Sequence, residues 1–212
     1  MPHVHIVNNH PILKSMINAR PGYYLVEAEH LNLADTFIFP GGEDVDPILY
    51  DEMRHPSTVL NPERNKMFFD LWQKICAPDK IKIGICGGGQ FLNVMNGGRM
   101  WQDADGHAMT GTHEIIYMNE KGESETHDVT STHHQIMIPS KYAEVWGFCF
   151  RSTRRDTGYT MNHPTNFSRD GPDHEILYYP KTRSLCFQPH PEYFSANCRE
   201  LFFRCLRRIT GE

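Results

Sequence analysis

A strand-like run that passes directly into a helical pattern constrains the fold of this 212-residue chain more than any other stretch. KIKIGIC (80–86) is short and β-branched, as in a buried strand, and FLNVMN (91–96) has apolar residues at helical spacing. Only GGGQ separates the two runs, and Gly97 and Gly98 end the helix. A strand followed at once by a helix is half of a βαβ unit, which builds parallel sheets.

Strand and helix patterns alternate through the rest of the first half. Asn61 as N-cap and Pro62 at the first helical position predict a helix that Pro78 ends. Further strands are predicted at HVHIV (3–7), YYLVEA (23–28) and DTFIFP (35–40). This alternation predicts an α/β fold, a doubly wound and mostly parallel sheet.

The second half has a different pattern. Shorter strands joined by polar turns run from 113 to 150, and DHEILYYP with TRSLCFQP predicts a hairpin around Pro180. Ser195 is the expected N-cap of a last helix, whose cysteines Cys198 and Cys205 we expect to pack in the core. We therefore predict a few antiparallel strands here, within a single domain over residues 1–212. The segment 152–172 carries no motif and is interpreted as a surface loop or a lid.

Composition excludes several kinds of partner. The net charge of −5 predicts binding to neither nucleic acid nor a membrane surface. No stretch approaches the ~18 apolar residues of a membrane span, and the N-terminal residues do not read as a signal peptide. Six cysteines without a CxxC pair are typical of reduced thiols, so we expect a cytoplasmic protein. Nothing in the composition indicates an oligomeric state.

Cys86 stands at the junction of the predicted strand and helix, flanked by Gly84 and Gly88. A nucleophile on such a sharp turn needs small residues two before and two after it, because larger side chains would collide with backbone. The helix N-terminus would stabilise a thiolate, and its free N–H groups, beginning with Gly87, could receive an oxyanion. Taken alone, the pattern is equally compatible with a small buried core thiol.

A proton carrier for such a thiolate occurs in CFQPHPEYF (186–194). His190 and Glu192 are two residues apart, so in an extended segment both side chains point to the same side. Glu192 could then orient the imidazole of His190, as the third member of a catalytic triad does. Upstream, the Gly-Gly turn of FIFPGGEDVDP could expose a backbone N–H for the second half of an oxyanion hole.

Histidines and acidic residues elsewhere match no metal-binding motif. The spacings of five histidines fit neither HExxH nor a zinc ribbon, and no cysteine pair supports them. Asp44 and Asp46 lack the spacing of a calcium loop, so we expect turn or capping roles. The sequence therefore predicts no metal site and no cofactor. The five histidines are His107, His113, His127, His133 and His134.

Five segments, in this order, resemble the class I glutamine amidotransferases. They are FPGGEDVDPILY (39–50), GICGGGQ (84–90), VTSTHHQ (129–135), DG…EILYY (170–179) and FQPHPE (187–192), and the resemblance covers about residues 35–195. The most similar branch is the γ-glutamyl hydrolase-like one, peptidase C26, which includes γ-glutamyl-γ-aminobutyrate hydrolases. The resemblance implies a flavodoxin-like three-layer sandwich.

The resemblance also implies roles for individual residues. Cys86, His190 and Glu192 match the nucleophile, the general acid/base and the orienting carboxylate of the family. The N–H groups of Gly42 and Gly87 match its oxyanion hole. The residues that match its substrate pocket are Gln90, His133 and His134.

Two enzymatic functions follow from the resemblance, with a non-catalytic one as a third possibility. The chain could be a glutaminase that passes ammonia from glutamine to a separate synthetase subunit, or a stand-alone hydrolase of γ-glutamyl amines. Gly87 stands where the hydrolase branch often has Arg. The part of the pocket that receives the leaving group is therefore expected to differ from that of the hydrolase branch. A regulatory relative without catalysis is disfavoured by the complete Cys-His-Glu set.

Overall fold

The computed structural model describes residues 1–157 and 171–211, with only the backbone described at 109–110. Most of the segment predicted as a surface loop or lid, 152–172, therefore lies outside the described residues. Within the described part, no helix is both long and apolar enough to cross a lipid bilayer.

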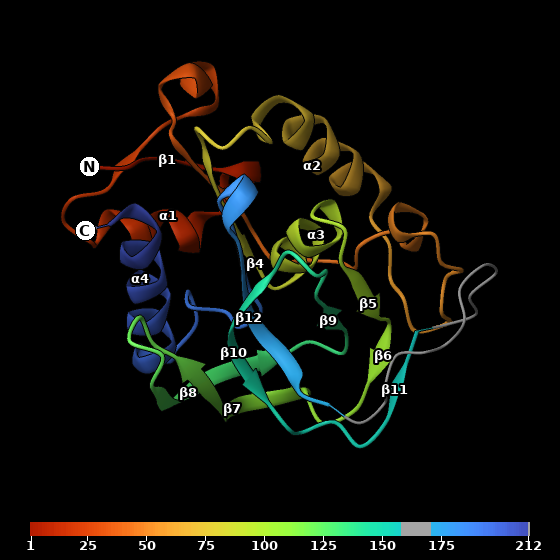
Figure 1. Cartoon of the computed structure of the whole chain (residues 1–212). Coiled ribbons are helices and arrows are strands. Elements are labelled where there is room, and N and C mark those ends of the chain that lie inside the picture. Colours follow the sequence, from red (N-terminus) through yellow and green to blue (C-terminus); the bar gives the residue numbers. More distant parts are fainter. Residues whose placement is uncertain (158–170, 212) are drawn as a thin grey trace.

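One large sheet forms the centre of the molecule (Figure 1). Its parallel half consists of β2 (Tyr24–Leu25), β1 (His3–Ile6), β3 (Thr36–Phe39), β4 (Ile81–Ile85) and β13 (Ser184–Phe187), in this spatial order. Its antiparallel half continues with β12 (Asp173–Tyr179), β10 (Glu144–Cys149), β7 (Ala108–Met118) and β8 (Ser124–Thr132). The α/β sheet, parallel first and antiparallel in the second half, is confirmed.

Shorter strands extend the antiparallel half. β9 (Ile136–Ile138) pairs with both β12 and β5 (Arg99–Trp101), while β6 (Asp103–Ala104) and β11 (Arg155–Asp156) form a separate ribbon. The predicted hairpin is confirmed: β12 and β13 are joined by the 3₁₀ turn η4 (Pro180–Thr182), and Arg183 closes it at φ 50°.

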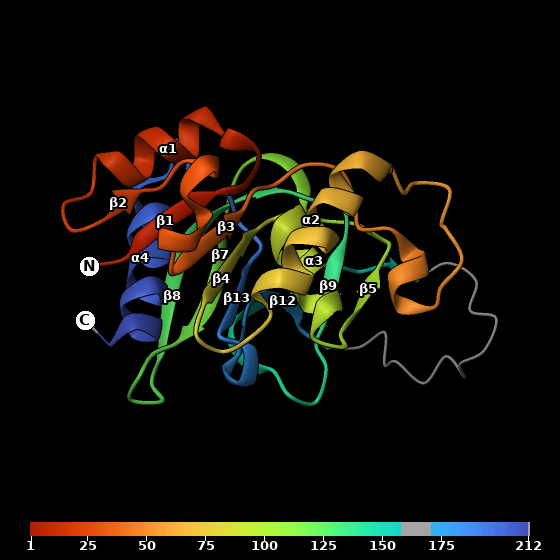
Figure 2. The ribbon, with the colours of Figure 1, turned by 90° about the horizontal axis from the view of Figure 1, so that it is seen from above.

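Helices cover both faces of the sheet (Figure 2). α1 (Pro11–Asn18) and α4 (Ala196–Thr210) pack on one face in a core that includes Ile83 and Ile85. α2 (Pro62–Ile75) and α3 (Gly87–Met95) pack on the other, in a core that includes Phe37 and Phe39. Because alternate residues of a strand point to opposite faces, β3 and β13 each contribute residues to both cores. The result is the predicted three-layer, flavodoxin-like arrangement.

Capping signals placed the starts of α2 and α4 correctly. The Asn61 side chain accepts a hydrogen bond from the Arg64 N–H (3.1 Å), and the Ser195 hydroxyl accepts one from Cys198 (3.2 Å). Cys198 and Cys205 are fully buried, as predicted for core residues.

One boundary differs from the expectation. The strand predicted at 23–28 is only Tyr24–Leu25, because the chain then turns into the 3₁₀ segment η2 (Ala28–Leu33). α3 begins at Gly87, directly after the cysteine turn as predicted, although glycine is a poor helix former. Two further 3₁₀ turns, η1 (Val7–Asn9) and η3 (Pro47–Tyr50), lie in the first half.

Candidate active site

Cys86 lies on a strained turn between β4 and α3. Its backbone has φ 47° and ψ −115°, a region that residues other than glycine rarely adopt. A side chain at Gly84 would place its Cβ 2.2 Å from the Gly88 carbonyl oxygen, and one at Gly88 would come 2.0 Å from the Phe39 oxygen. The two flanking glycines are therefore required by the close approach of backbone, as the sequence pattern predicted.

His190 and Glu192 follow the end of β13, the strand beside β4. The His190 ring contacts Glu192 through Nδ1, 2.8 Å from Oε1, and both side chains are buried. The backbone of His190 is held by Thr130, whose hydroxyl accepts from the His190 N–H (2.7 Å) and donates to its carbonyl (3.1 Å). The Tyr193 ring stacks on the imidazole, with 4.5 Å between centroids. The histidine is thus fixed on three sides.

Cys86 and His190 form a charge pair. Burial raises the pKa of the Cys86 thiol, but the positive charge and hydrogen bond of His190, with smaller effects from His133 and the Gly87 N–H, lower it overall. Burial lowers the pKa of His190, but the Cys86 thiolate and Glu192 together raise it to about 11. The two groups therefore stabilise each other's charged forms, which favours a thiolate beside an imidazolium more than isolated side chains would.

The Gly41–Gly42 turn lies against this pair. A Cβ at Gly41 would be 2.7 Å from His190 Cε1, and a Cβ at Gly87 would be 2.9 Å from the Gly42 carbonyl oxygen. The turn is held by Arg64 of α2, which donates to the carbonyls of Pro40 (2.9 Å) and Glu43 (2.8 Å). The two glycines predicted for the oxyanion hole, Gly42 and Gly87, are therefore neighbours in space.

A cavity of about 250 Å³ opens onto the cysteine. Among its walls are all of the predicted substrate-pocket residues, Gln90, His133 and His134, together with Cys86 and Gly42. Gln90 donates to the Gln188 side-chain oxygen (3.2 Å), and His134 contacts Asp44 (3.2 Å). A larger cavity, about 710 Å³, lies between η1, η2 and α2 and contains none of these residues. Because only the smaller of these two cavities opens onto Cys86, it is the candidate substrate pocket.

Four contributors to this site were not predicted as such. Arg64 holds the glycine turn, Thr130 and Tyr193 hold His190, and the Gln188 amide lies 3.5 Å from the Cys86 sulfur. Thr130 and Gln188 occur inside the segments VTSTHHQ and FQPHPE, so the motifs contained a signal for them. Nothing in the sequence indicated that Arg64, buried at the start of a helix, turns back to the 40–43 loop.

The five histidines considered for metal binding on the basis of sequence fall into two groups in the structure. His127 contacts Glu125 and His134 contacts Asp44, at the edges of the sheet and of the cavity. His107, His113 and His133 instead gather around the buried Glu175, each within 3.5 Å of its Oε1. Sequence spacing had predicted no such cluster. Asp46 accepts from the Ile48 N–H (3.1 Å) and caps η3, as expected for a turn residue.

Comparison with known proteins identifies the family of the chain. The model of the Peptidase C26 family matches residues 16–145, more than half of the chain. Over 126 residues the chain is 31% identical to the glutamine amidotransferase-like protein YvdE of Lactococcus lactis subsp. lactis (strain IL1403). That alignment covers 51% of this chain and 52% of YvdE, so the chain matches about half the length of that relative.

Two solved structures share the fold at low sequence identity. A Thermoplasma acidophilum protein that is described as belonging to GMP synthase superposes with a TM-score of 0.63 at 15% identity, covering 100% of this chain and 98% of that one. A chain of PurLQS from Thermotoga maritima gives 0.59 at 17% identity, covering 99% and 100%. With the family match, the fold and the cysteine turn in agreement, the chain belongs to the peptidase C26 family of class I glutamine amidotransferases.

Proposed function

We propose that this protein is a glutaminase, in which Cys86 attacks the γ-amide carbonyl of glutamine. The observation that carries the proposal is the buried contact between Cys86 and an imidazole that Glu192 orients at 2.8 Å, beside a cavity that admits a small ligand. A thiolate that already carries its charge needs no general base for the attack.

In the first half of the reaction, a C–S bond forms and the C–N bond of the amide breaks. The N–H groups of Gly42 and Gly87 stabilise the oxyanion of the tetrahedral intermediate. The His190 imidazolium gives its proton to the departing nitrogen, which leaves as ammonia. The product on the protein is a γ-glutamyl thioester of Cys86.

In the second half, water hydrolyses the thioester. His190 is now neutral and takes a proton from the attacking water, while the C–S bond breaks and the Cys86 thiolate returns. Glutamate leaves, and His190 is again an imidazolium. Glu192 keeps the ring in one orientation and stabilises its positive charge in both halves.

A partner that consumes ammonia is the second part of the proposal. Its support is that one structural neighbour is described as part of a GMP synthase, and another belongs to PurLQS. The alternative is a stand-alone hydrolase of γ-glutamyl amines, supported by the match to the peptidase C26 family.

Glutamate release by the purified protein separates the two functions. A stand-alone hydrolase should turn over members of a γ-glutamyl amine panel faster than glutamine. A glutaminase awaiting its partner should turn over both slowly, yet be labelled at Cys86 by an electrophilic glutamine analogue. If the analogue does not label Cys86, the enzymatic proposal is wrong.

The charge pair predicts an unusual pH profile for alkylation. Because the pKa of Cys86 is lowered, its rate with iodoacetamide should rise less steeply through the neutral range than that of an ordinary thiol. An ordinary thiol, with a pKa of about 8.5, gains roughly tenfold in rate per pH unit there. In Glu192→Gln, the imidazolium loses a negative neighbour, so the pKa of Cys86 should rise and the midpoint of the profile move to higher pH.

The matched control is Glu200→Gln, which removes an exposed carboxylate that pairs with Arg20. This variant should leave the profile unchanged. Modification is followed at Cys86 itself by peptide mass spectrometry, since the exposed Cys76 also reacts. A Cys86 profile that rises tenfold per pH unit in the wild-type protein would contradict the charge pair.

Arg64 is proposed as a positioning residue for the oxyanion turn. Arg64→Met removes both hydrogen bonds to the turn while keeping a long apolar side chain over Phe68. Because Gly42 is then less well placed, kcat should fall by about 10- to 100-fold, with a smaller change in KM. Arg183→Met, which removes a hydrogen bond to the Ile209 carbonyl far from the turn, is the control. Equal kcat losses in the two variants would assign Arg64 a structural role only.

A further inference from the structure

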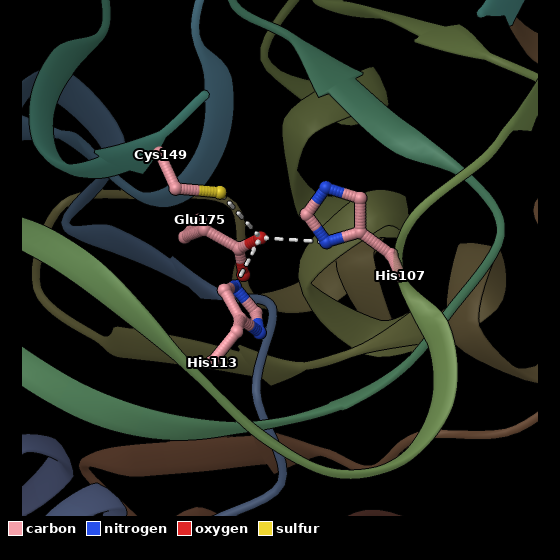
Figure 3. Close-up of side chains that lie close together, drawn as sticks. All are labelled: His107, His113, Cys149 and Glu175. Atoms are coloured by element: carbon pink, nitrogen blue, oxygen red, sulfur yellow. Dashed lines mark hydrogen bonds and ion pairs between the residues drawn. The ribbon is translucent and has the colours of Figure 1, made fainter. Parts of the chain in front are cut away.

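A buried cluster of nitrogen, sulfur and oxygen ligands lies beyond the wall of the candidate active site. His107 directly precedes β7, His113 lies within β7, Cys149 ends β10 and Glu175 lies in β12. All four are buried, and one ligand atom from each lies within 4.8 Å of the others. Figure 3 shows the two imidazoles and the thiol converging on the Glu175 carboxylate. None of the four has a role in the reaction proposed above.

The spacing of these atoms fits tetrahedral coordination. Glu175 Oε1 lies 3.3 Å from His107 Nδ1, 3.3 Å from His113 Nε2 and 3.9 Å from Cys149 Sγ. Zinc bonds of about 2.0–2.3 Å in a tetrahedron place neighbouring ligand atoms roughly 3.3–3.7 Å apart. The three distances to the Glu175 oxygen are close to this range and the remaining pairs lie within 4.8 Å, so side-chain movements of about 1 Å would place the four atoms around one ion.

Of the four ring nitrogens of His107 and His113, three make no hydrogen bond to a described residue. His107 Nδ1 and His113 Nε2 are close to the carboxylate, but neither makes a hydrogen bond of good geometry within the described residues. The second nitrogen of His113, Nδ1, is also buried without a hydrogen-bond partner there. Leaving a buried polar group unsatisfied costs about 1–3 kcal/mol, so three such nitrogens in one place need an explanation. A cation bound through His107 Nδ1 and His113 Nε2 would account for two of them.

The surroundings of His107 match the usual support of a metal-binding histidine. Its other nitrogen, Nε2, lies 3.1 Å from Asp173 Oδ2, which fixes the ring and leaves Nδ1 for the ion. Asp173 in turn pairs with Arg155 at 2.8 Å. The charge of the supporting carboxylate is therefore already balanced without the ion.

We propose that His107, His113, Cys149 and Glu175 form a closed, four-ligand site for a divalent transition metal, with Zn²⁺ favoured by the mixed donor set. A thiolate, a carboxylate and two neutral imidazoles carry two negative charges, so Zn²⁺ makes the buried site neutral. The thiol proton of Cys149 is released when the ion binds. The four ligands occupy every tetrahedral position, which assigns the ion a structural role that links β7, β10 and β12.

The site also supports the wall of the active-site cavity. His133, which lines that cavity, lies 3.5 Å from Glu175 Oε1, and its ring is 4.6 Å from that of His107. Removal of the ion should therefore loosen His133 as well as the three strands. The inference does not depend on the proposed reaction, because its test measures metal and needs no turnover.

Metal content and cobalt spectroscopy test the proposal on the full chain with any affinity tag removed. The purified protein should contain about one equivalent of zinc, and chelation should remove it and lower Tm. Reconstitution with Co²⁺ should produce the charge-transfer band of a Co²⁺–thiolate bond. Cys149→Ser should lose this band, whereas Cys205→Ser, which changes an equally buried cysteine in α4, should retain it.

Two further measurements keep the proposal open to refutation. Cys86→Ala should retain both the zinc and the cobalt band, since a metal held by the nucleophile would be lost in this variant. If Cys149→Ser does not fold, zinc-edge X-ray absorption of the wild-type protein should give one sulfur and three nitrogen or oxygen neighbours. A protein that is metal-free as purified and shows no cobalt–thiolate band after reconstitution would overturn the proposal, as would a band lost in Cys86→Ala.

Discussion

Replacement of Cys86 by alanine is expected to lower kcat/KM for γ-amide hydrolysis by at least ~10³-fold, because the covalent route then has no nucleophile. The cavity and the His190–Glu192 contact should remain, so substrate binding should persist while the thioester cannot form. Glutamate release from glutamine, or from the best γ-glutamyl amine, measures the loss. Intact-protein mass spectrometry after quenching should find an acyl adduct on the wild-type protein but not on Cys86→Ala.

Cys76→Ala is the matched control for this variant. Cys76 is an exposed cysteine that follows α2, so its removal should change neither the rate nor the acyl adduct. Activity that survives in Cys86→Ala but falls in another cysteine variant would assign the nucleophile elsewhere. A wild-type protein that has no activity and forms no adduct would instead support a non-catalytic relative.

Gly88→Ala is expected to destabilise the fold by about 3 kcal/mol or more, although it adds a single methyl group. The new Cβ would lie 2.0 Å from the Phe39 carbonyl oxygen and 2.8 Å from that of Pro40. Both contacts are with backbone, so no side chain can rotate away, and α3 has to move from β3. Urea unfolding followed by circular dichroism measures the change in the free energy of unfolding.

Gly171→Ala is the matched glycine control. Among the described residues, the nearest atom to a Cβ there is Arg155 Nη1, at 3.9 Å, which is ordinary van der Waals contact. This variant should unfold at nearly the wild-type urea concentration. If Gly88→Ala is as stable as Gly171→Ala, the close packing of α3 on β3 at the cysteine turn is wrong.

Much of the fold was predictable because its signals are local. Strands such as β4 and β13 contain β-branched or apolar runs, and the starts of α2 and α4 have capping residues that act within one turn. The predicted length of β2 was too great because the chain leaves the sheet after Leu25 and turns into the 3₁₀ segment η2. The start of α3 was predicted although glycine has low helix propensity, because the small residues around Cys86 indicate a sharp strand-to-helix turn.

The catalytic candidates were predictable for the same reason. Gly84 and Gly88 restrict the turn around Cys86 within five residues, and the alternation of an extended segment places Glu192 beside His190. By contrast, the guanidinium of Arg64 contacts carbonyls more than twenty residues away, and Thr130 holds a backbone sixty residues away. No local pattern records such contacts.

The sequence by itself determined the βαβ frame, the cysteine turn and the His-x-Glu pair, because each depends on steric and hydrogen-bonding rules that act over a few residues. Only the tertiary structure decided that His107, His113, Cys149 and Glu175 meet in one buried cluster. His107 and Glu175 are 68 residues apart in the sequence. The strands that carry or adjoin the four residues are brought together by the pairing of the whole sheet. Spacing rules for metal motifs apply to ligands on one helix or one loop, so they could not detect ligands that antiparallel strand pairing brings together.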